Sequence, residues 1–428
     1  MRVEILYLMA ESELLVTFML GLSLLLVAIS AVHRYTRTFI IPGVAILMFL
    51  GATLAIVPII SHEVDKFYGI IETIPEIVYL VIIPILIFDS GRKLSVGQMK
   101  NEAIPIGYFA IIGVILTILI IGIGVNFIFH IPLIDALLLG TILAATDPVA
   151  VGVIFKKFPI PRRLNIIIEG ESLFNDATGV ISFNVVKGII FSGVVFSFAD
   201  VSVSFIWSML GAIAFGTGLG WIGGKILDKW NADEFVDFTF SLGLAIGGFI
   251  VADHFLHISA IVTTLFIAMF IVTRHKEVST GVRKLFHKYW DYLGFVTNSI
   301  LFFVIGIPLL AVESYQNSGV ALIIIIVAPF AIMMFSRAVV IYSGSAFLRI
   351  FRVRIPLQWQ NILTIGGLRG GIAVALVLSL SSDYQFKDLF ISIVVPLIAI
   401  NLVVNPIALN LYLKKTSSKM APSNSDIH

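Results

Sequence analysis

Residues 144–152 read AATDPVAVG and residues 365–373 read IGGLRGGIA, and each stretch lies inside a long apolar segment. Pro148 removes a backbone donor and clashes with the preceding helical turn, while four of the six residues from 366 to 371 are glycines that support a helix poorly. Proline and glycine can also merely kink or pack a membrane helix. The two stretches occupy matched positions and each carries a charge, so we predict that both helices unwind halfway.

The composition of the chain is that of a membrane protein. Of its 428 residues 59% are hydrophobic and 13% charged, and the mean hydropathy is +1.05, far outside the range of soluble domains. A membrane-spanning helix needs about 20 mostly apolar residues. Thirteen segments meet this criterion: 14–33, 38–60, 75–90, 103–129, 134–155, 164–192, 203–227, 235–256, 258–273, 291–312, 319–346, 357–381 and 387–412. We therefore expect an all-α polytopic fold in one membrane domain, 1–428.

The basic residues predict the orientation of these helices. Of the 28 lysines and arginines, 22 lie in the odd-numbered connections and the C-terminal tail, whereas three lie in the N-terminus and the even-numbered connections. Cytoplasmic loops carry the excess of positive charge. We expect a multi-pass protein of the cell membrane with its N-terminus outside and its C-terminus in the cytoplasm. The acidic start of the chain leads into a full-length apolar segment, which favours a retained helix over a cleaved signal peptide.

Several classes of site and partner are excluded or left open by composition. The chain has no cysteine, which excludes disulfides, thiolate metal sites and cysteine nucleophiles. The net charge of +2 without a long basic run does not indicate nucleic acid as a partner. No cofactor motif is present, so we expect no cofactor and a process driven by existing gradients. The basic stretch 274–288 is interpreted either as an interfacial helix for anionic membrane lipid or as plain cytoplasmic topology.

The two interruptions also indicate an internal repeat. Arg369 lies 221 residues after Pro148, and the interruptions fall in the fifth of helices 1–6 and the fifth of helices 8–13. A single helix between the two halves, 203–227, would give the second half the opposite orientation in the membrane. Inverted repeats with interrupted helices at the midplane are typical of secondary transporters. We therefore predict a core built from 103–192 and 319–412, with crossed unwound helices 5 and 12.

The stretch EGESLFNDATG, residues 169–179, places carboxylates inside helix 6. Side chains three and four residues apart share a helix face, which stacks Ser172 on Asp176 and Glu171 on Asn175. With Thr146 and Asp147 of the unwound helix 5, they would form an oxygen-rich wall. Such donors suit a small hard cation.

A carboxylate at membrane depth can hold a proton as well as a cation, because burial disfavours its charged form and a nearby cation favours it. The two occupants exclude each other, and if the empty carrier cannot reorient, this competition alone gives antiport. We assign Asp176 as the exchanging group. Arg337 and Arg369 also lie within helices, and since an unpaired buried charge is costly, we pair Glu171 with one of them.

Five stretches resemble the monovalent cation:proton antiporters, in particular the NhaP-like sodium/proton antiporter branch. They are FDSGRKL (88–94), ATDPVAVGVIF (145–155), EGESLFNDATGV (169–180), FSRAVVIY (335–342) and GGLRGGIAVAL (366–376). They occur in family order across most of the predicted core. The resemblance implies exchange of a monovalent cation, Na⁺ or alternatively Li⁺, for H⁺ by a thirteen-helix homodimer whose scaffold comprises 14–90 and 235–312.

The resemblance also implies roles for individual residues. The Na⁺ ligands are Asp176, Thr146, Ser172 and, through water, Glu171, with Asp147 nearby and Asn175 orienting the site. The Asn175–Asp176 pair is similar to that of members that exchange one cation for one proton electroneutrally. A further implied pair joins Asp89 to Arg337.

Two other functions remain as alternatives. A cation channel would need a filter or a pore ring, and no repeated filter-like segment is present. An intramembrane aspartyl enzyme could use Asp147 and Asp176, but its GxGD motif is absent. The sequence therefore favours a transporter that is not an enzyme.

Overall fold

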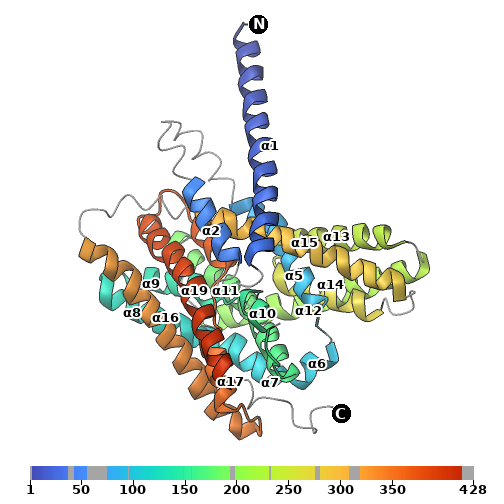
Figure 1. Cartoon of the computed structure of the whole chain (residues 1–428). Helices are drawn as coiled ribbons and strands as arrows, with labels where there is room; N and C mark the ends of the chain where they lie inside the picture. Colours follow the sequence, from blue (N-terminus) through green and yellow to red (C-terminus); the bar gives the residue numbers. More distant parts are fainter. Residues whose placement is uncertain are drawn as a thin grey trace.

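The computed structural model describes residues 2–36, 43–54, 75–94, 96–147, 149–155, 157–192, 198–230, 233–274, 280–307 and 319–416, and every regular element in these ranges is a helix (Figure 1). The expected all-α fold is confirmed. Residues 275–279 of the basic stretch 274–288 lie outside the described ranges, so neither interpretation of that stretch is tested.

Each of the thirteen expected segments falls on helical structure in its described part, while 38–42, 55–60, 148 and 308–312 lie outside the described residues. In chain order the segments correspond to α1 (Arg2–Thr36); α2 (Gly43–Leu54); η1 and α5 (Val78–Ile82, Ile83–Gly91); α7, η2 and α8 (Ala103–Gly107, Tyr108–Ile112, Gly113–Phe129); α9 and α10 (Leu133–Ala144, Val149–Phe155); α11 (Arg162–Ser192); α12 (Phe198–Trp230); α13 and η3 (Glu234–Ile250, Val251–Phe255); α14 (Ala260–Arg274); α15 (Thr280–Gly306); α16 (Gly319–Leu348); α17 and α18 (Leu357–Ile365, Gly371–Leu378); and α19 (Lys387–Thr416). A short helix, α6 (Val96–Asn101), follows α5.

Six stretches of these helices are long and apolar enough to cross a membrane by themselves: Met19–Thr36, Ala103–Phe129, Ser202–Trp230, Glu234–Phe255, Ile324–Phe351 and Lys387–Thr416. Other apolar helices are shorter, such as Leu133–Ala144 before the first break. The helix α11 is long but does not meet the criterion, because polar and charged residues lower its hydropathy. The helix that carries the predicted site is thus less suited to lipid than these six stretches.

The packing separates two groups of helices, with α11 between them. In one group α8 packs against α9 and α16, and α19 packs against α16, α17 and α18. In the other, α14 packs against α5, α12 and α13, while α15 packs against α2, α5 and α13. The central α11 contacts α9 of the first group and α14 of the second. A side chain on α11 therefore lies between the two groups.

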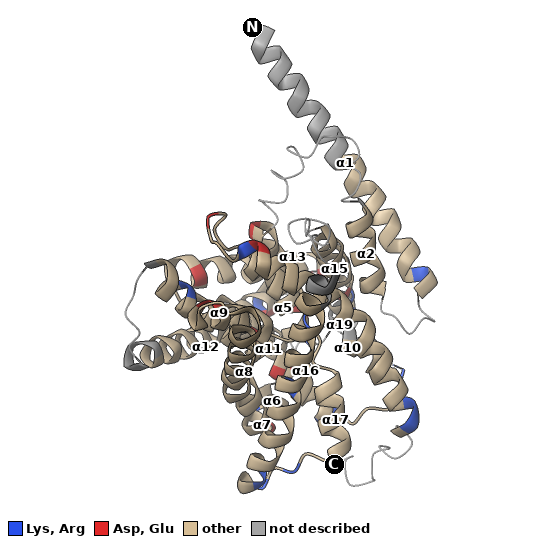
Figure 2. Cartoon of the chain, turned by 90° about the vertical axis from the view of Figure 1, so that its left-hand side faces the viewer, with Lys and Arg blue, Asp and Glu red and all other residues tan. Residues whose placement is uncertain are grey.

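The outer surface is apolar, as a bilayer requires. Large hydrophobic side chains such as Leu24, Phe127, Val203 and Trp207 are exposed. Figure 2 shows that charged residues are sparse along most of the helices. In water such a surface would be unstable, whereas in lipid it faces hydrocarbon. The chain is a multi-pass membrane protein.

Both predicted interruptions are present, and they cross. The helix α9 ends at Ala144 and α10 begins at Val149, while α17 ends at Ile365 and α18 begins at Gly371. The backbone N–H of Asp147 donates to the carbonyl of Leu368 over 2.8 Å, which joins the first break directly to the second. Unwound backbone at membrane depth must find partners inside the protein, since lipid offers none. The crossing supplies one of them.

Candidate functional site

The helix α11 brings its polar face to the first break. Glu171, Ser172, Asn175 and Asp176 are all buried, and Thr146 from the break is buried beside them. The predicted i, i+4 pair is formed, because the Asn175 amide nitrogen donates to Glu171 Oε1 over 3.0 Å. Residue spacing on one helix thus determined which side chains face the break.

The first break is held by hydrogen bonds from α11 to the backbone and side chain of Thr146. The Thr146 N–H donates to Asn175 Oδ1 over 3.3 Å, and Asn175 Nδ2 donates to Thr146 Oγ1 over 2.6 Å. The Ser172 hydroxyl donates to the carbonyl of Thr146. An amide and a hydroxyl thereby replace the hydrogen bonds that the unwound helix has lost. The same contacts fix the Thr146 and Ser172 oxygens next to each other.

The buried carboxylate of Glu171 pairs with Arg337 of α16. Arg337 Nη1 lies 2.8 Å from Glu171 Oε1, and Nη2 lies 2.9 Å from Oε2, which makes a two-point ion pair. Arg337 Nε also donates to the Leu363 carbonyl at the end of α17. Paired and hydrogen-bonded in this way, both charges are tolerated at membrane depth. Of the two arginines considered for Glu171, the structure places Arg337 there.

The implied pairing of Asp89 with Arg337 is wrong. Asp89 instead accepts hydrogen bonds from its own turn, from Arg92 Nη2 at 2.5 Å and from Lys93 Nζ at 2.6 Å. Arg92 continues the cluster to Asp291 on α15 at 2.5 Å. The reason is local, since i, i+3 and i, i+4 partners in the sequence DSGRK are available before any distant arginine. Asp89 remains a charge-pairing residue, with different partners.

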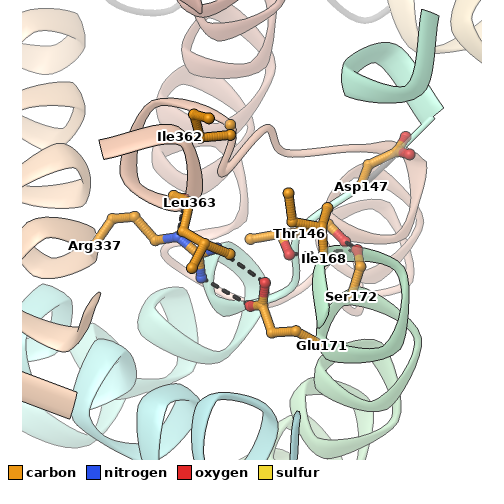
Figure 3. A pocket seen from close by; sticks show the side chains of 9 residues that line it. Thr146, Asp147, Ile168, Glu171, Ser172, Arg337, Ile362 and Leu363 are labelled. Atoms are coloured by element: carbon orange, nitrogen blue, oxygen red, sulfur yellow. Dashed lines mark hydrogen bonds and ion pairs between the residues drawn. The ribbon is translucent and has the colours of Figure 1, made fainter. Parts of the chain in front are cut away.

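Asp147 faces the second break and not the Glu171 pair. A Cβ atom added to Gly370 would lie 2.4 Å from Asp147 Oδ2 and 2.5 Å from its Cβ, so the carboxylate packs against the backbone where α18 begins. A negative charge at a helix N-terminus is favoured by the helix dipole. Figure 3 shows the Asp147 side chain pointing away from the Glu171–Arg337 pair.

A small pocket opens between the first break, α11 and the end of α17 (Figure 3). The cavity volume is about 10 Å³, room for roughly one water or one bare cation. Four of the six predicted cation-site residues line it together with Arg337, namely Thr146, Asp147, Glu171 and Ser172. Asn175 lies behind them, bonded to Thr146 and Glu171.

Asp176 and Arg369 lie outside this lining but within electrostatic range of each other. Asp176 is 8% exposed, and the described residues offer its carboxylate no hydrogen bond. Its charge interacts with those of Asp147, Glu171 and Arg369. Arg369 is 1% exposed, and its Nε and Nη1 likewise find no acceptor among the described residues. The structure thus gathers three carboxylates and two guanidinium groups around the two breaks.

Two residues of the site were missed by sequence reasoning, Asn401 and Asn405 of α19. The Arg369 N–H donates to Asn401 Oδ1 over 2.9 Å, and Asn405 Nδ2 donates to the Ile365 carbonyl over 2.9 Å. Both asparagines are buried and lie four residues apart on one helix face. The signal was available, since two amides at helical spacing inside an apolar segment need buried partners.

Comparison with known proteins agrees with this geometry. The family described as sodium/hydrogen exchanger, transmembrane, matches residues 21–415. The chain is 27% identical over 399 residues to the Na(+)/H(+) antiporter ApNhaP of Aphanothece halophytica, which covers 92% of this chain and 73% of that protein. It is 30% identical over 351 residues to the Na(+)/H(+) antiporter NhaP of Pseudomonas aeruginosa, covering 78% and 80%.

The fold has a solved counterpart. The sodium proton antiporter MjNhaP1 from Methanocaldococcus jannaschii superimposes with a TM-score of 0.77 at 19% identity, covering 95% of this chain and all of that one. The matched sequence runs through both breaks, α11 and α19. The chain belongs to the sodium/hydrogen exchanger family, a family of transporters and not of enzymes.

Proposed function

We propose that this protein exchanges one Na⁺ for one H⁺ across the cell membrane by letting the two compete for Asp176. The observation that carries the proposal is a buried Asp176 carboxylate without a hydrogen-bond donor among the described residues, next to the pocket walled by Thr146 and Ser172 oxygens. A buried charge without a partner is unstable. Either a proton or a cation relieves it, and each excludes the other.

The charge balance around the breaks favours an electroneutral cycle. Asp147, Glu171 and Asp176 carry up to three negative charges, and Arg337 and Arg369 carry two positive ones. One negative charge is left over, which a single Na⁺ or a single H⁺ neutralises. A carrier in which both loaded forms have equal charge moves no net charge in a full cycle, so a membrane potential neither drives nor opposes it.

The ligand roles follow from which oxygens are already committed. Both Glu171 oxygens accept hydrogen bonds from Arg337, so we assign Glu171 an indirect contribution through water. We assign Asp176, Thr146 and Ser172 as direct Na⁺ ligands, with Asn175 holding Thr146 in place. Asp147 stabilises the start of α18 and adds negative charge. Hydroxyl and carboxylate oxygens suit a small hard cation, Na⁺ or Li⁺.

The surroundings of the site complete the proposal. We assign 103–192 and 319–412 as the moving core, 14–90 and 235–312 as a scaffold that forms a homodimer, and 203–227 as the linker helix. The relatives named as Na(+)/H(+) antiporters support the choice of Na⁺ and H⁺ as substrates.

The basic connections support an external N-terminus and a cytoplasmic C-terminus. Membrane lipid is the expected environment, and no nucleic acid or cofactor is needed.

The deciding experiment uses proteoliposomes loaded at acid pH. Sodium, lithium or potassium is added outside, proton efflux is followed with a pH-sensitive dye, and the membrane potential is first clamped and then left free. We expect sodium to drive a saturable efflux that is the same under both conditions. Efflux that depends on the potential would contradict the one-for-one ratio, and unsaturable flux would favour a channel.

The pH dependence tests the competition itself. If Na⁺ and H⁺ share Asp176, a fall in pH raises the apparent KM for sodium, because protonated carriers cannot bind it. In the range where the site is mostly protonated, each fall of one pH unit should raise the sodium KM about tenfold, because the proton concentration rises tenfold. A sodium KM that stays constant across this range would show that the two ions bind at separate sites.

A further inference from the structure

The end of α16 and its connection to α17 carry three exposed arginines, Arg349, Arg352 and Arg354. No carboxylate among the described residues forms an ion pair with any of them. Between Glu313 and Asp383 the sequence contains no aspartate or glutamate. The loop thus exposes three positive charges that the described part of the protein does not neutralise.

This loop lies where a membrane-crossing stretch ends. The stretch Ile324–Phe351 is long and apolar enough to cross a membrane, and its end lies at one end of the molecule (Figure 1). Large apolar side chains are exposed on both sides of the loop, with Ile350 74% and Leu357 65% exposed. Such side chains are unfavourable in water and favourable in lipid. The three arginines therefore lie at the depth of the lipid headgroups, next to the hydrocarbon.

Hydrogen bonds from other elements hold the backbone of the loop. Arg163 Nη1, at the start of α11, donates to the Arg354 carbonyl over 3.3 Å, and Gln360 Nε2 donates to the Ile355 carbonyl over 2.8 Å. Arg163 is itself held by Glu102, whose Oε1 accepts from its Nε over 2.8 Å. A loop that is already ordered loses little entropy when it binds a ligand. The arginine side chains thus start from fixed backbone positions.

Arg352 has a left-handed backbone conformation that favours glycine. Its φ is 61° and its ψ is 14°, directly after the short helix η6 (Arg349–Phe351). The N–H groups of Arg352 and Val353 donate to the carbonyls of Arg349 and Leu348, a helix ending at which glycine is the usual residue. An arginine is strained in this conformation because it has a Cβ atom. Its presence indicates that the guanidinium has a purpose other than folding.

We propose that Arg349, Arg352 and Arg354 bind the phosphate headgroup of an anionic phospholipid. Guanidinium groups bind phosphate oxygens through paired, charge-assisted hydrogen bonds. The exposed apolar side chains beside them contact the acyl chains, a contribution that a free phosphate could not use. The loop joins α16, which carries Arg337, to α17, which leads into the second break, so the lipid contacts the proposed moving core. This site is separate from the proposed exchange at Asp176 and does not depend on it.

The first test measures lipid binding to the detergent-purified full chain through its melting temperature, since a ligand that binds only the folded state stabilises it. We expect phosphatidylglycerol to raise the melting temperature in a saturable manner. Phosphatidylcholine tests the need for net negative charge, and glycerol 3-phosphate tests the headgroup without acyl chains. An equal rise with phosphatidylcholine would refute recognition by charge. An equal rise with glycerol 3-phosphate would show an anion site and refute the lipid.

The second test compares two double variants that each remove two positive charges. Arg349→Gln with Arg352→Gln changes the loop, whereas Lys414→Gln with Lys415→Gln changes two exposed lysines in the last turn of α19. We expect the arginine variant to raise the half-saturating phosphatidylglycerol concentration at least about tenfold, because charge-assisted hydrogen bonds are lost. The lysine variant should leave it unchanged. Equal weakening in both would show unspecific attraction and overturn the proposal, as would normal binding by the arginine variant.

Arg352→Asn separates lipid binding from folding and replaces the double variant if that variant aggregates. Asparagine adopts the left-handed conformation more readily than arginine does, so the melting temperature without lipid should not fall. The half-saturating phosphatidylglycerol concentration should nevertheless rise several-fold, because one guanidinium group is lost. Lipid binding equal to that of the wild type contradicts the role of Arg352, whatever the melting temperature of the variant.

Discussion

The two helix breaks share a backbone plan but present opposite charges. The first, between α9 and α10, places the Thr146 hydroxyl against the polar face of α11 and the Asp147 carboxylate against Gly370 of the second break. The second, between α17 and α18, offers the buried guanidinium of Arg369 among glycines. In both, side chains of the following helix satisfy the free backbone groups. The two breaks thus share a pattern of backbone hydrogen bonds but differ in their side chains: the first carries oxygens of the proposed cation site, and the second carries the guanidinium of Arg369.

The largest effect is expected at the acidic half of this comparison, for Asp176→Asn. The asparagine amide is similar in size to the carboxylate. It cannot take up and release a proton, and it lacks the negative charge that binds a cation. We expect sodium-driven proton efflux to fall by more than about a hundredfold, since an ionic partner at a buried site contributes several kcal/mol. Proteoliposome efflux measures this, and size-exclusion chromatography confirms that the variant is folded.

Asp383→Asn is the matched control for that variant. Asp383 is an exposed carboxylate in the connection after α18, whereas Asp176 is buried. It should exchange ions at the wild-type rate. If both Asp176→Asn and Asp383→Asn exchange ions at the wild-type rate, the assignment of Asp176 as the exchanging group is wrong.

The next effect concerns the stability that the buried Glu171–Arg337 ion pair provides. Glu171→Gln leaves the Arg337 guanidinium buried without its ionic partner, which should lower the free energy of unfolding by about 3–5 kcal/mol. The melting temperature of the detergent-purified protein measures the loss. Glu102→Gln breaks a more exposed ion pair, to Arg163 at 2.8 Å, and should cost about 0.2–1 kcal/mol. Equal melting temperatures for the two variants would contradict the structural role of the buried pair.

A smaller effect is expected where the two breaks touch, for Gly370→Ala. The added Cβ would lie within 2.8 Å of three Asp147 atoms, so Asp147 or the break has to move. We expect efflux to slow about tenfold, consistent with about 1–3 kcal/mol of overpacking. Gly152→Ala in α10 is the control, because its Cβ would meet no atom within 4 Å. A Gly370→Ala variant as active as Gly152→Ala would mean that this close crossing is not required.

The smallest effect is expected for Ser172→Ala, which removes one donor from the first break and one proposed ligand. Loss of a single hydrogen bond, about 1 kcal/mol, corresponds to a rise of roughly fivefold in the sodium KM. Thr178→Val is the matched control, since among the described residues its hydroxyl bonds only to the Phe174 carbonyl one turn earlier on α11. An unchanged KM in Ser172→Ala would move the cation away from the Ser172 side of the pocket.

Sequence patterns predicted the parts of the molecule in which local chemistry decides. Pro148 and the glycines at 366–371 located both breaks, because a proline or a cluster of glycines weakens a helix locally and the two stretches occupy matched positions. The i, i+4 spacing of Glu171 and Asn175 predicted their contact, since helix geometry alone brings such residues together. Helix geometry also explains why the implied Asp89–Arg337 pair was wrong, because Asp89 has nearer partners in Arg92 and Lys93.

The sequence by itself determined a multi-pass helical membrane protein with two interrupted helices and a carboxylate-bearing helix, because hydropathy, helix period and backbone sterics act over a few residues. Only the tertiary structure decided that Arg337 forms the ion pair with Glu171 and that Asp147 packs against Gly370. It also decided that Asn401 accepts a hydrogen bond from the backbone of Arg369. These pairings join helices far apart in the chain. Which buried charge meets which partner depends on how the helices pack, and no local pattern encodes that choice.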